Sequence, residues 1–251
     1  MARVIALGTA AAVPNEAHAT TYLAVAGEQG FYLIDCGDSP VVRIRQAGLA
    51  LERLQGLIIT HFHPDHASGI PILLMNVWLL GRSEPLPVYG LQDALDRFAA
   101  MMALFRWQEW PGLFEVLCCV VAEEIGATVL EDDEFRITGA PVCHLVPALG
   151  LRIENKRSGG VLAYSSDTSP AEEVVALAHG ADVLIHEAAG NTLGHSSAAQ
   201  AGEIARQAGV DRLVLIHYRP SPQKYERWLA EAGAAFGGPV ELAQDFGEYV
   251  F

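Results

Sequence analysis

Four side chains of the kind that bind metal ions fall within six residues of this chain. His61, His63, Asp65 and His66 follow the apolar run at residues 57–59. Side chains alternate along a strand, so the two earlier residues point to one side of a strand end, and the turn that follows can return the two later ones. Imidazole and carboxylate are ligands that zinc, manganese and iron accept. Because crowded polar side chains gain nothing unless something binds them, we interpret the segment as a metal site and not as a polar loop.

Three further candidate ligands stand at the ends of later apolar runs. They are His144, Asp167 and His217. Loops at strand ends often hold functional residues. Each residue alone is weak evidence, because a single Asp in such a place is commonly a turn residue and a single His commonly makes an ordinary hydrogen bond. Together with the first cluster, they predict one site built from distant parts of the chain.

Short apolar runs alternate with helical patterns along the chain. Strands are expected at residues 4–7, 21–26, 31–35, 57–60, 86–89, 134–138, 142–145, 149–153, 161–164, 183–186, 213–217 and 249–251. Helices are expected at residues 41–47, 70–80, 91–105, 171–178, 197–208 and 223–232. Strands followed by helices in both halves predict a layered α/β sandwich with a pair of mixed sheets.

The composition favours a folded protein that acts on a small substrate. Hydrophobic residues make up 51% of the 251 positions, which is enough for a sizeable core. The net charge of −14 would repel a nucleic-acid backbone.

No apolar run reaches the roughly 18–20 residues that span a bilayer, and the N-terminus is expected to form a first strand. We therefore expect a cytoplasmic protein with no membrane contact. Cys118 and Cys119, in an apolar segment, are expected to be buried thiols.

The whole chain resembles the metallo-β-lactamase superfamily. Residues 60–66 resemble its HxHxDH motif, and the three later ligands occur in its order. Residues 7–14 resemble the opening of its ribonuclease Z branch, as do residues 186–189 and 194–200. The resemblance implies a single domain over residues 1–251 with a four-layer αββα sandwich fold. Within that domain we expect a helical, aromatic-rich insertion at about 91–122.

The same resemblance implies two divalent metal ions, with zinc expected and manganese or iron as alternatives. One ion would be held by His61, His63 and His144, the other by Asp65, His66 and His217, with Asp167 between them. Two ions about 3.5–4 Å apart share a bridging hydroxide nucleophile and stabilise the departing oxygen. Asp65 would also orient that hydroxide.

By resemblance, His195 protonates the leaving oxygen as general acid and Glu187 orients it or a ligand histidine. Without the resemblance, the residues around His195 favour a different reading. Ser196 or Ser197 then caps the following helix and His195 merely precedes it.

Two departures from the resemblance bear on the substrate. The ribonucleases Z that process transfer RNA carry a long RNA-gripping arm between the third ligand motif and the bridging Asp. Here only residues 145–166 lie between them, and residues 154–160 are expected to form a hairpin turn. We therefore do not expect transfer RNA as a partner. The aromatic stretch at 91–122 is open to interpretation as helix packing, as an apolar lid over the metals, or as the face of a homodimer.

These observations predict a dinuclear metal-dependent hydrolase of small phosphodiesters, with a small anionic ester as substrate. Sulfate-ester hydrolysis, as in an arylsulfatase, is the nearest alternative, and the opening of a lactone or another small ester is more remote. A different class also remains open, namely a di-iron redox protein or a binding protein on the same fold.

Overall fold

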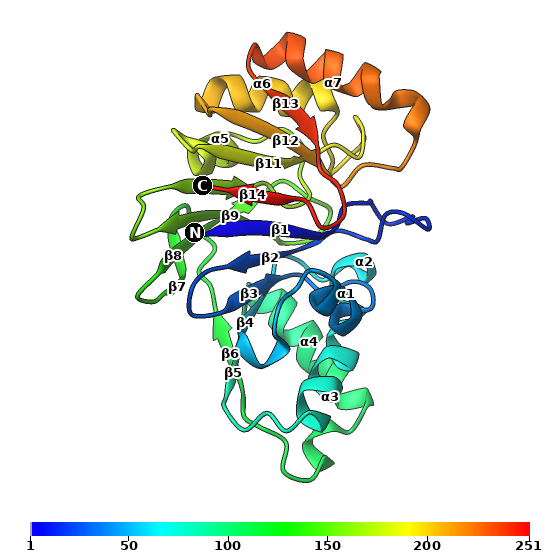
Figure 1. Cartoon of the computed structure of the whole chain (residues 1–251), viewed down its shortest axis with the longest axis vertical. Coiled ribbons are helices and arrows are strands. Elements are labelled where there is room, and N and C mark those ends of the chain that lie inside the picture. Colours follow the sequence, from blue (N-terminus) through cyan, green and yellow to red (C-terminus); the bar gives the residue numbers. More distant parts are fainter. Residues whose placement is uncertain (1) are drawn as a thin grey trace.

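Two mixed β-sheets pack face to face, and helices cover the outer side of each in this computed structural model (Figure 1). The structure describes residues 2–251. The strand order is β14-β1-β2-β3-β4-β5-β6 in the first sheet and β13-β12-β11-β10-β9-β8-β7 in the second. The predicted four-layer αββα sandwich is therefore confirmed.

The first half of the chain forms the first sheet, apart from β14, and its helices. Its elements are β1 (Arg3–Gly8), β2 (Tyr22–Ala26), β3 (Phe31–Ile34), α1 (Pro40–Gln46), the short 3-10 helix η1 (Leu51–Arg53), β4 (Leu54–Ile59), α2 (Pro64–Ala67), α3 (Ile70–Leu79), β5 (Leu86–Gly90), α4 (Gln92–Leu104), η2 (Trp107–Glu109) and β6 (Val116–Val120).

The second half forms the second sheet and closes the first with the last strand. Its elements are β7 (Ala127–Glu131), β8 (Phe135–Val142), β9 (Ala148–Asn155), β10 (Val161–Tyr164), α5 (Glu172–Ala178), β11 (Val183–Glu187), α6 (Ala198–Ala208), β12 (Arg212–Ile216), α7 (Pro222–Phe236), β13 (Val240–Leu242) and β14 (Glu248–Val250). Across residues 2–251, every helix is too short or too polar to traverse a lipid bilayer.

The alternation of side chains along each strand divides the core into three layers. On β4, Ile58 faces the layer between the sheets, whereas Ile59 faces the helices outside the first sheet. On β12, Val214 and Leu215 divide in the same way between the inner layer and the layer beneath α5, α6 and α7. Each sheet has a core layer on both sides, so its strands must be apolar on both faces.

The aromatic stretch packs as core on the outer face of the first sheet. Phe98 and Met102 of α4 are fully buried there, and the Trp78 and Trp110 rings stack with centroids 5.1 Å apart. Helix packing thus accounts for Phe98 and Met102, whereas Leu104 and Phe105 stay 82% and 53% exposed. The description of residues 91–122 as an insertion stays a prediction.

Several predicted elements differ from those observed. The predicted strand at 142–145 does not exist, because β8 continues without a break to Val142 and the chain then turns away from the sheet. Pro141 can lie within β8 because β7 pairs with β8 only as far as Gly139, which leaves that stretch with an open edge. Strands β6, β7 and β13 were not expected. The prediction of buried thiols at Cys118 and Cys119 is wrong, because β6 is the edge strand of its sheet and leaves Cys118 exposed.

One buried histidine makes the fold sensitive to acid. His186 on β11 has no exposed surface, its Nδ1 donates to the Glu187 carbonyl oxygen at 2.8 Å, and its Nε2 has no partner among the described residues. Burial lowers the pKa of His186 from 6.5 to about 4. The unfolded chain then binds a proton that the folded chain does not, so stability falls as the pH drops from 6.5 towards 4.

We predict that His186→Phe reduces this acid-induced loss. Between about pH 7.5 and pH 5, the wild-type free energy of unfolding should fall by about 2 kcal/mol more than that of the variant. Urea unfolding of the chelator-treated protein at both pH values measures the difference. The exposed His179→Phe is the matched control, and equal losses in His186→Phe and wild type would refute the prediction.

Candidate metal centre

The predicted ligands lie just beyond the carboxyl ends of strands from both sheets. Within each sheet these ends share an edge where neighbouring strands are parallel, as for β4 with β5 and for β10 with β11 and β12. The ligands that follow β4, β8, β10 and β12 are, in that order, His61 to His66, His144, Asp167 and His217. The topology therefore brings residues from distant parts of the sequence to one place.

Three imidazoles converge at one side of this place. His63 Nδ1 lies 3.2 Å from His61 Nε2 and 3.1 Å from His144 Nε2. These three nitrogens lie within 4.8 Å of one another, which is the spacing of ligands around a single ion.

A second group lies beside the first, and Asp167 stands between them. Asp65 Oδ2 is 3.6 Å from His66 Nε2 and 4.0 Å from His217 Nε2. Asp167 Oδ2 reaches both groups, at 3.1 Å from His217, 3.5 Å from His66, 3.9 Å from His61 and 4.0 Å from His144. All seven residues predicted as ligands are thus brought together.

The donor set fits divalent cations. His66 Nε2 and Asp167 Oδ1 are buried and have no hydrogen-bond partner among the described residues. Burial lowers the pKa of His61 and of His144, so their imidazoles stay neutral and offer lone pairs. Within residues 2–251, no Lys or Arg forms an ion pair with the carboxylates of this centre. A divalent cation would supply the missing positive charge.

A residue that the sequence interpretation missed, Asp35, orients part of the first cluster. It follows β3, is fully buried, and accepts hydrogen bonds at 2.8 Å from the Thr60 amide and at 2.8 Å from the Thr60 hydroxyl. His66 Nδ1 donates to the same carboxylate at 2.8 Å, so His66 Nε2 is directed into the centre. The only available signal was an Asp at the end of a predicted strand, a position that sequence alone does not distinguish from a turn.

Hydrogen bonds fix the tautomers of two further imidazoles. The Thr60 hydroxyl proton goes to Asp35, so His61 Nδ1, at 3.1 Å, donates to the Thr60 oxygen. His144 Nδ1 donates to the Gly194 carbonyl oxygen at 2.7 Å. In each ring Nε2 is left unprotonated and faces the centre.

The backbone is strained around the site. Asp35, Ser166 and His217 have φ angles of 63°, 55° and 52°, in the left-handed region that residues other than glycine rarely adopt. Each lies at or next to a residue of the centre. Such strain persists only where surrounding contacts hold it, and it is concentrated at functional sites.

The fully buried Glu187 pairs with the partly exposed His195 beside the metal cluster. Glu187 accepts hydrogen bonds from His195 Nδ1 at 3.0 Å and from the backbone amides of Ser196, Thr168 and Ala189. The bond to Glu187 raises the pKa of His195, whereas burial raises the pKa of Glu187. His195 Nδ1 is 4.0 Å from Asp167 Oδ2, and its side chain is 22% exposed. The expected helix cap is also present, since Ser197 and Gln200 form a capping box at the start of α6.

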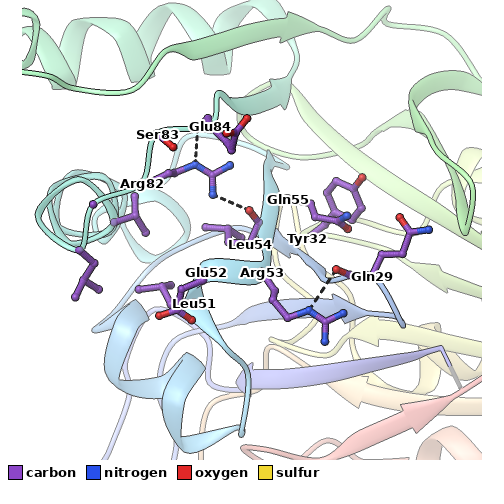
Figure 2. Close-up of a pocket in the computed structure, with 13 residues that line it drawn as sticks. Gln29, Tyr32, Leu51, Glu52, Arg53, Leu54, Gln55, Arg82, Ser83 and Glu84 are labelled. Carbon is purple, nitrogen blue, oxygen red and sulfur yellow. Dashed lines mark hydrogen bonds between the residues drawn. The ribbon is translucent and has the colours of Figure 1, made fainter.

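A different cleft, of about 610 Å³, lies at the amino end of β4, away from this centre (Figure 2). Its Arg82 donates to the carbonyl oxygens of Leu54, Glu84 and Pro85, and its Arg53 donates to that of Gln29. Its lining includes none of the predicted site residues. The chemistry predicted from the sequence therefore belongs to the strand ends opposite this cleft.

Comparisons with known proteins agree with this geometry. A family model described as "Beta-lactamase superfamily domain" matches residues 31–218. A curated relative named Ribonuclease Z, from Methanothermobacter thermautotrophicus, is 32% identical over 303 positions that cover 98% of this chain and 95% of the relative. That alignment is longer than the 251 residues of this chain, so the relative carries residues that this chain lacks.

Two solved structures share the fold over nearly the whole length. The metallo-β-lactamase fold protein YhfI from Bacillus subtilis superposes with a TM-score of 0.82 at 22% identity, covering 99% of this chain and 98% of that one. Human tRNase Z, short form, gives a TM-score of 0.79 at 25% identity with the same coverage.

We predict that Asp35→Asn weakens metal binding about 10- to 100-fold, because the amide cannot replace both acceptor oxygens and His66 loses its orientation. Titration of the chelator-treated protein with Zn²⁺ in a competing indicator measures the affinity. The exposed Asp133→Asn should bind like the wild type. Wild-type affinity in Asp35→Asn would rule out the orienting role.

Proposed function

This chain belongs to the β-lactamase superfamily, within its ribonuclease Z-like branch, and is a metal-dependent, phosphodiesterase-like hydrolase; we propose that its substrate is a small phosphodiester. The observation that carries the proposal is the position of Asp167, whose Oδ2 lies within 4.0 Å of ligand nitrogens from both groups. A carboxylate so placed suits a pair of ions. Members of this superfamily use divalent metal ions, and we propose two, with zinc as the metal.

In this proposal His61, His63 and His144 would hold one ion, Asp65, His66 and His217 would hold the other, and Asp167 would contribute to both. When bound, such a pair supplies a hydroxide nucleophile near neutral pH and stabilises negative charge on the departing oxygen. The chain contributes neutral imidazoles of fixed tautomer and a set of aligned carboxylates. Asp65, whose side chain is 14% exposed, would also orient the attacking water.

His195 serves as the general acid. Its Nδ1 donates to Glu187, which leaves Nε2 to carry the proton that the leaving oxygen receives. Glu187 is held by three backbone amides, so the orientation of the His195 ring is fixed before the substrate arrives. The bond to Glu187 also raises the pKa of His195, which favours the protonated form that an acid needs.

Cleavage of transfer RNA is the second candidate, because the curated relatives carry the name Ribonuclease Z. Two features of this chain favour a small substrate instead. Its net charge is −14, and residues 145–166 form a turn, β9, a short hairpin turn and β10, with no arm between them. The prediction that transfer RNA is not a substrate stays a prediction. Sulfate esters and lactones remain the alternatives of the same hydrolytic class.

A substrate panel tests the proposal. The zinc-loaded and manganese-loaded proteins are assayed with bis(p-nitrophenyl) phosphate, p-nitrophenyl sulfate, cyclic nucleotides, a lactone and a precursor transfer RNA. We expect the highest kcat/KM with a phosphodiester of low molecular mass. Preferential turnover of the RNA or of the sulfate would overturn the assignment, and oxygen consumption by an iron-loaded form would favour the redox class.

We predict that His195→Ala slows poor leaving groups most. General acid catalysis contributes about 10²–10⁴-fold when the leaving group is basic and little when it is acidic. A series of aryl methyl phosphates with leaving groups of increasing pKa measures this slope, and the metal content should stay at the wild-type value. Ser197→Ala, which removes only the helix cap and about 1 kcal/mol of stability, is the control. An equal loss across the series would remove His195 from the acid role.

A further inference from the structure

Two exposed leucines flank the imidazoles at the mouth of the metal centre. Leu145 directly follows His144 and is 57% exposed, and Leu193 precedes Gly194 and His195 and is 81% exposed. The centroids of the His144 and His195 rings are 5.1 Å apart. Single exposed leucines are common on protein surfaces. These two are distinguished by their position, one beside a predicted ligand and the other beside the proposed acid.

Gly194 brings the two leucine-bearing loops into direct contact. Its φ is +82°, and a Cβ at this position would lie 3.0 Å from Leu145 Cγ and 2.9 Å from His144 Nδ1. Its carbonyl oxygen accepts from His144 Nδ1, and its amide donates to the Ser169 hydroxyl at 3.0 Å. Only glycine permits so close an approach. The loop that carries Leu193 therefore packs directly against Leu145 and His144.

Leu145 and His144 also line an open cleft of about 380 Å³, whose lining is partly apolar and partly polar. Its apolar lining residues include Leu91, Pro141, Val142, Val146 and Pro147. Glu123 is its one carboxylate, and no Lys or Arg lies among the residues that line it. A nucleic-acid backbone would find no cation to pair with here, whereas an uncharged apolar group would lose its hydration shell favourably.

We propose that Leu145, Leu193 and this cleft receive the leaving group of the substrate, as an aryl or other uncharged apolar alcohol. The proposal rests on the proposed function, because His195 donates its proton to the leaving oxygen and the group attached to that oxygen must lie beside His195. The apolar surface next to His144 and His195 is where such a group would lie. Leu145 and Leu193 are then specificity-determining residues for the leaving group.

The experiment varies apolar size at constant leaving-group chemistry. Methyl phosphodiesters of phenol, 4-ethylphenol and 4-butylphenol have leaving groups of nearly equal pKa but increasing apolar area. In the wild type, kcat/KM should rise about two- to fourfold for each added methylene, the upper value corresponding to full burial. Leu145→Ser and Leu193→Ser should flatten this rise, and the double variant should abolish it. Both side chains are exposed, so neither substitution threatens the core.

The controls separate this inference from the function on which it rests. Leu104→Ser changes a leucine that is 82% exposed at the end of α4 and should keep the wild-type slope. His195→Ala should lower all three substrates by a similar factor, since their leaving groups differ little in pKa. A flat wild-type series, or an unchanged slope in the double leucine variant, overturns the inference while the hydrolase assignment stands. Failure of the metal-loaded wild type with all three, while it hydrolyses cyclic nucleotides, overturns the inference alone. Failure with these three, with bis(p-nitrophenyl) phosphate and with cyclic nucleotides overturns the proposed function itself.

Discussion

The structure depends on one electrostatic constraint. Five imidazoles and three buried or nearly buried carboxylates converge at the strand ends, and no Lys or Arg of residues 2–251 pairs with those carboxylates. Burying carboxylates without a counter-charge is costly. A protonated imidazole can offset part of this charge, because the Asp167 and Asp35 carboxylates outweigh burial and raise the pKa of His66 well above its usual value. Burial lowers the pKa of His61 and His144, so these two rings do not supply further positive charge. Divalent cations satisfy the carboxylates while leaving the imidazoles neutral, which is why the arrangement suits metal ions.

The surrounding fold serves to hold this arrangement in a single geometry. Asp35 accepts a hydrogen bond from His66 directly and is linked to His61 through the Thr60 hydroxyl. The Gly194 carbonyl oxygen accepts one from His144. Each contact fixes which ring nitrogen carries the proton, so the free lone pair is directed before any ion binds. The backbone at Asp35 and His217 is left-handed, and each residue follows the end of a strand. This conformation directs the chain towards the centre at those two points.

Much of the site could be predicted because metal ligands of the same type recur at strand ends in a fixed order. The cluster at residues 61–66 and the positions of His144, Asp167 and His217 sufficed to expect one centre, and the geometry brings them together. Asp35 could not be found in this way, because its role depends on parallel pairing of β3 with β4, which the sequence does not specify. The edge strand β6 was missed for a related reason, since a short apolar run with exposed cysteines resembles a buried segment until its missing neighbour is known.

The substrate-facing surface was the part least accessible to prediction. The aromatic-rich stretch at 91–122 could be interpreted from sequence as a lid over the metals. In the structure, two of its large apolar side chains, Phe98 and Met102, are buried in the helical layer. Leu145 and Leu193 carried no sequence signal, because their meaning comes from Gly194, which joins two loops that are distant in the chain. The central claim is that the centre binds two metal ions and that Asp167 contacts both. Anomalous diffraction from crystals of the zinc-loaded protein tests it most directly: the account predicts two peaks about 3.5–4 Å apart, both within bonding distance of Asp167. A single peak, or a pair that Asp167 does not join, would contradict it.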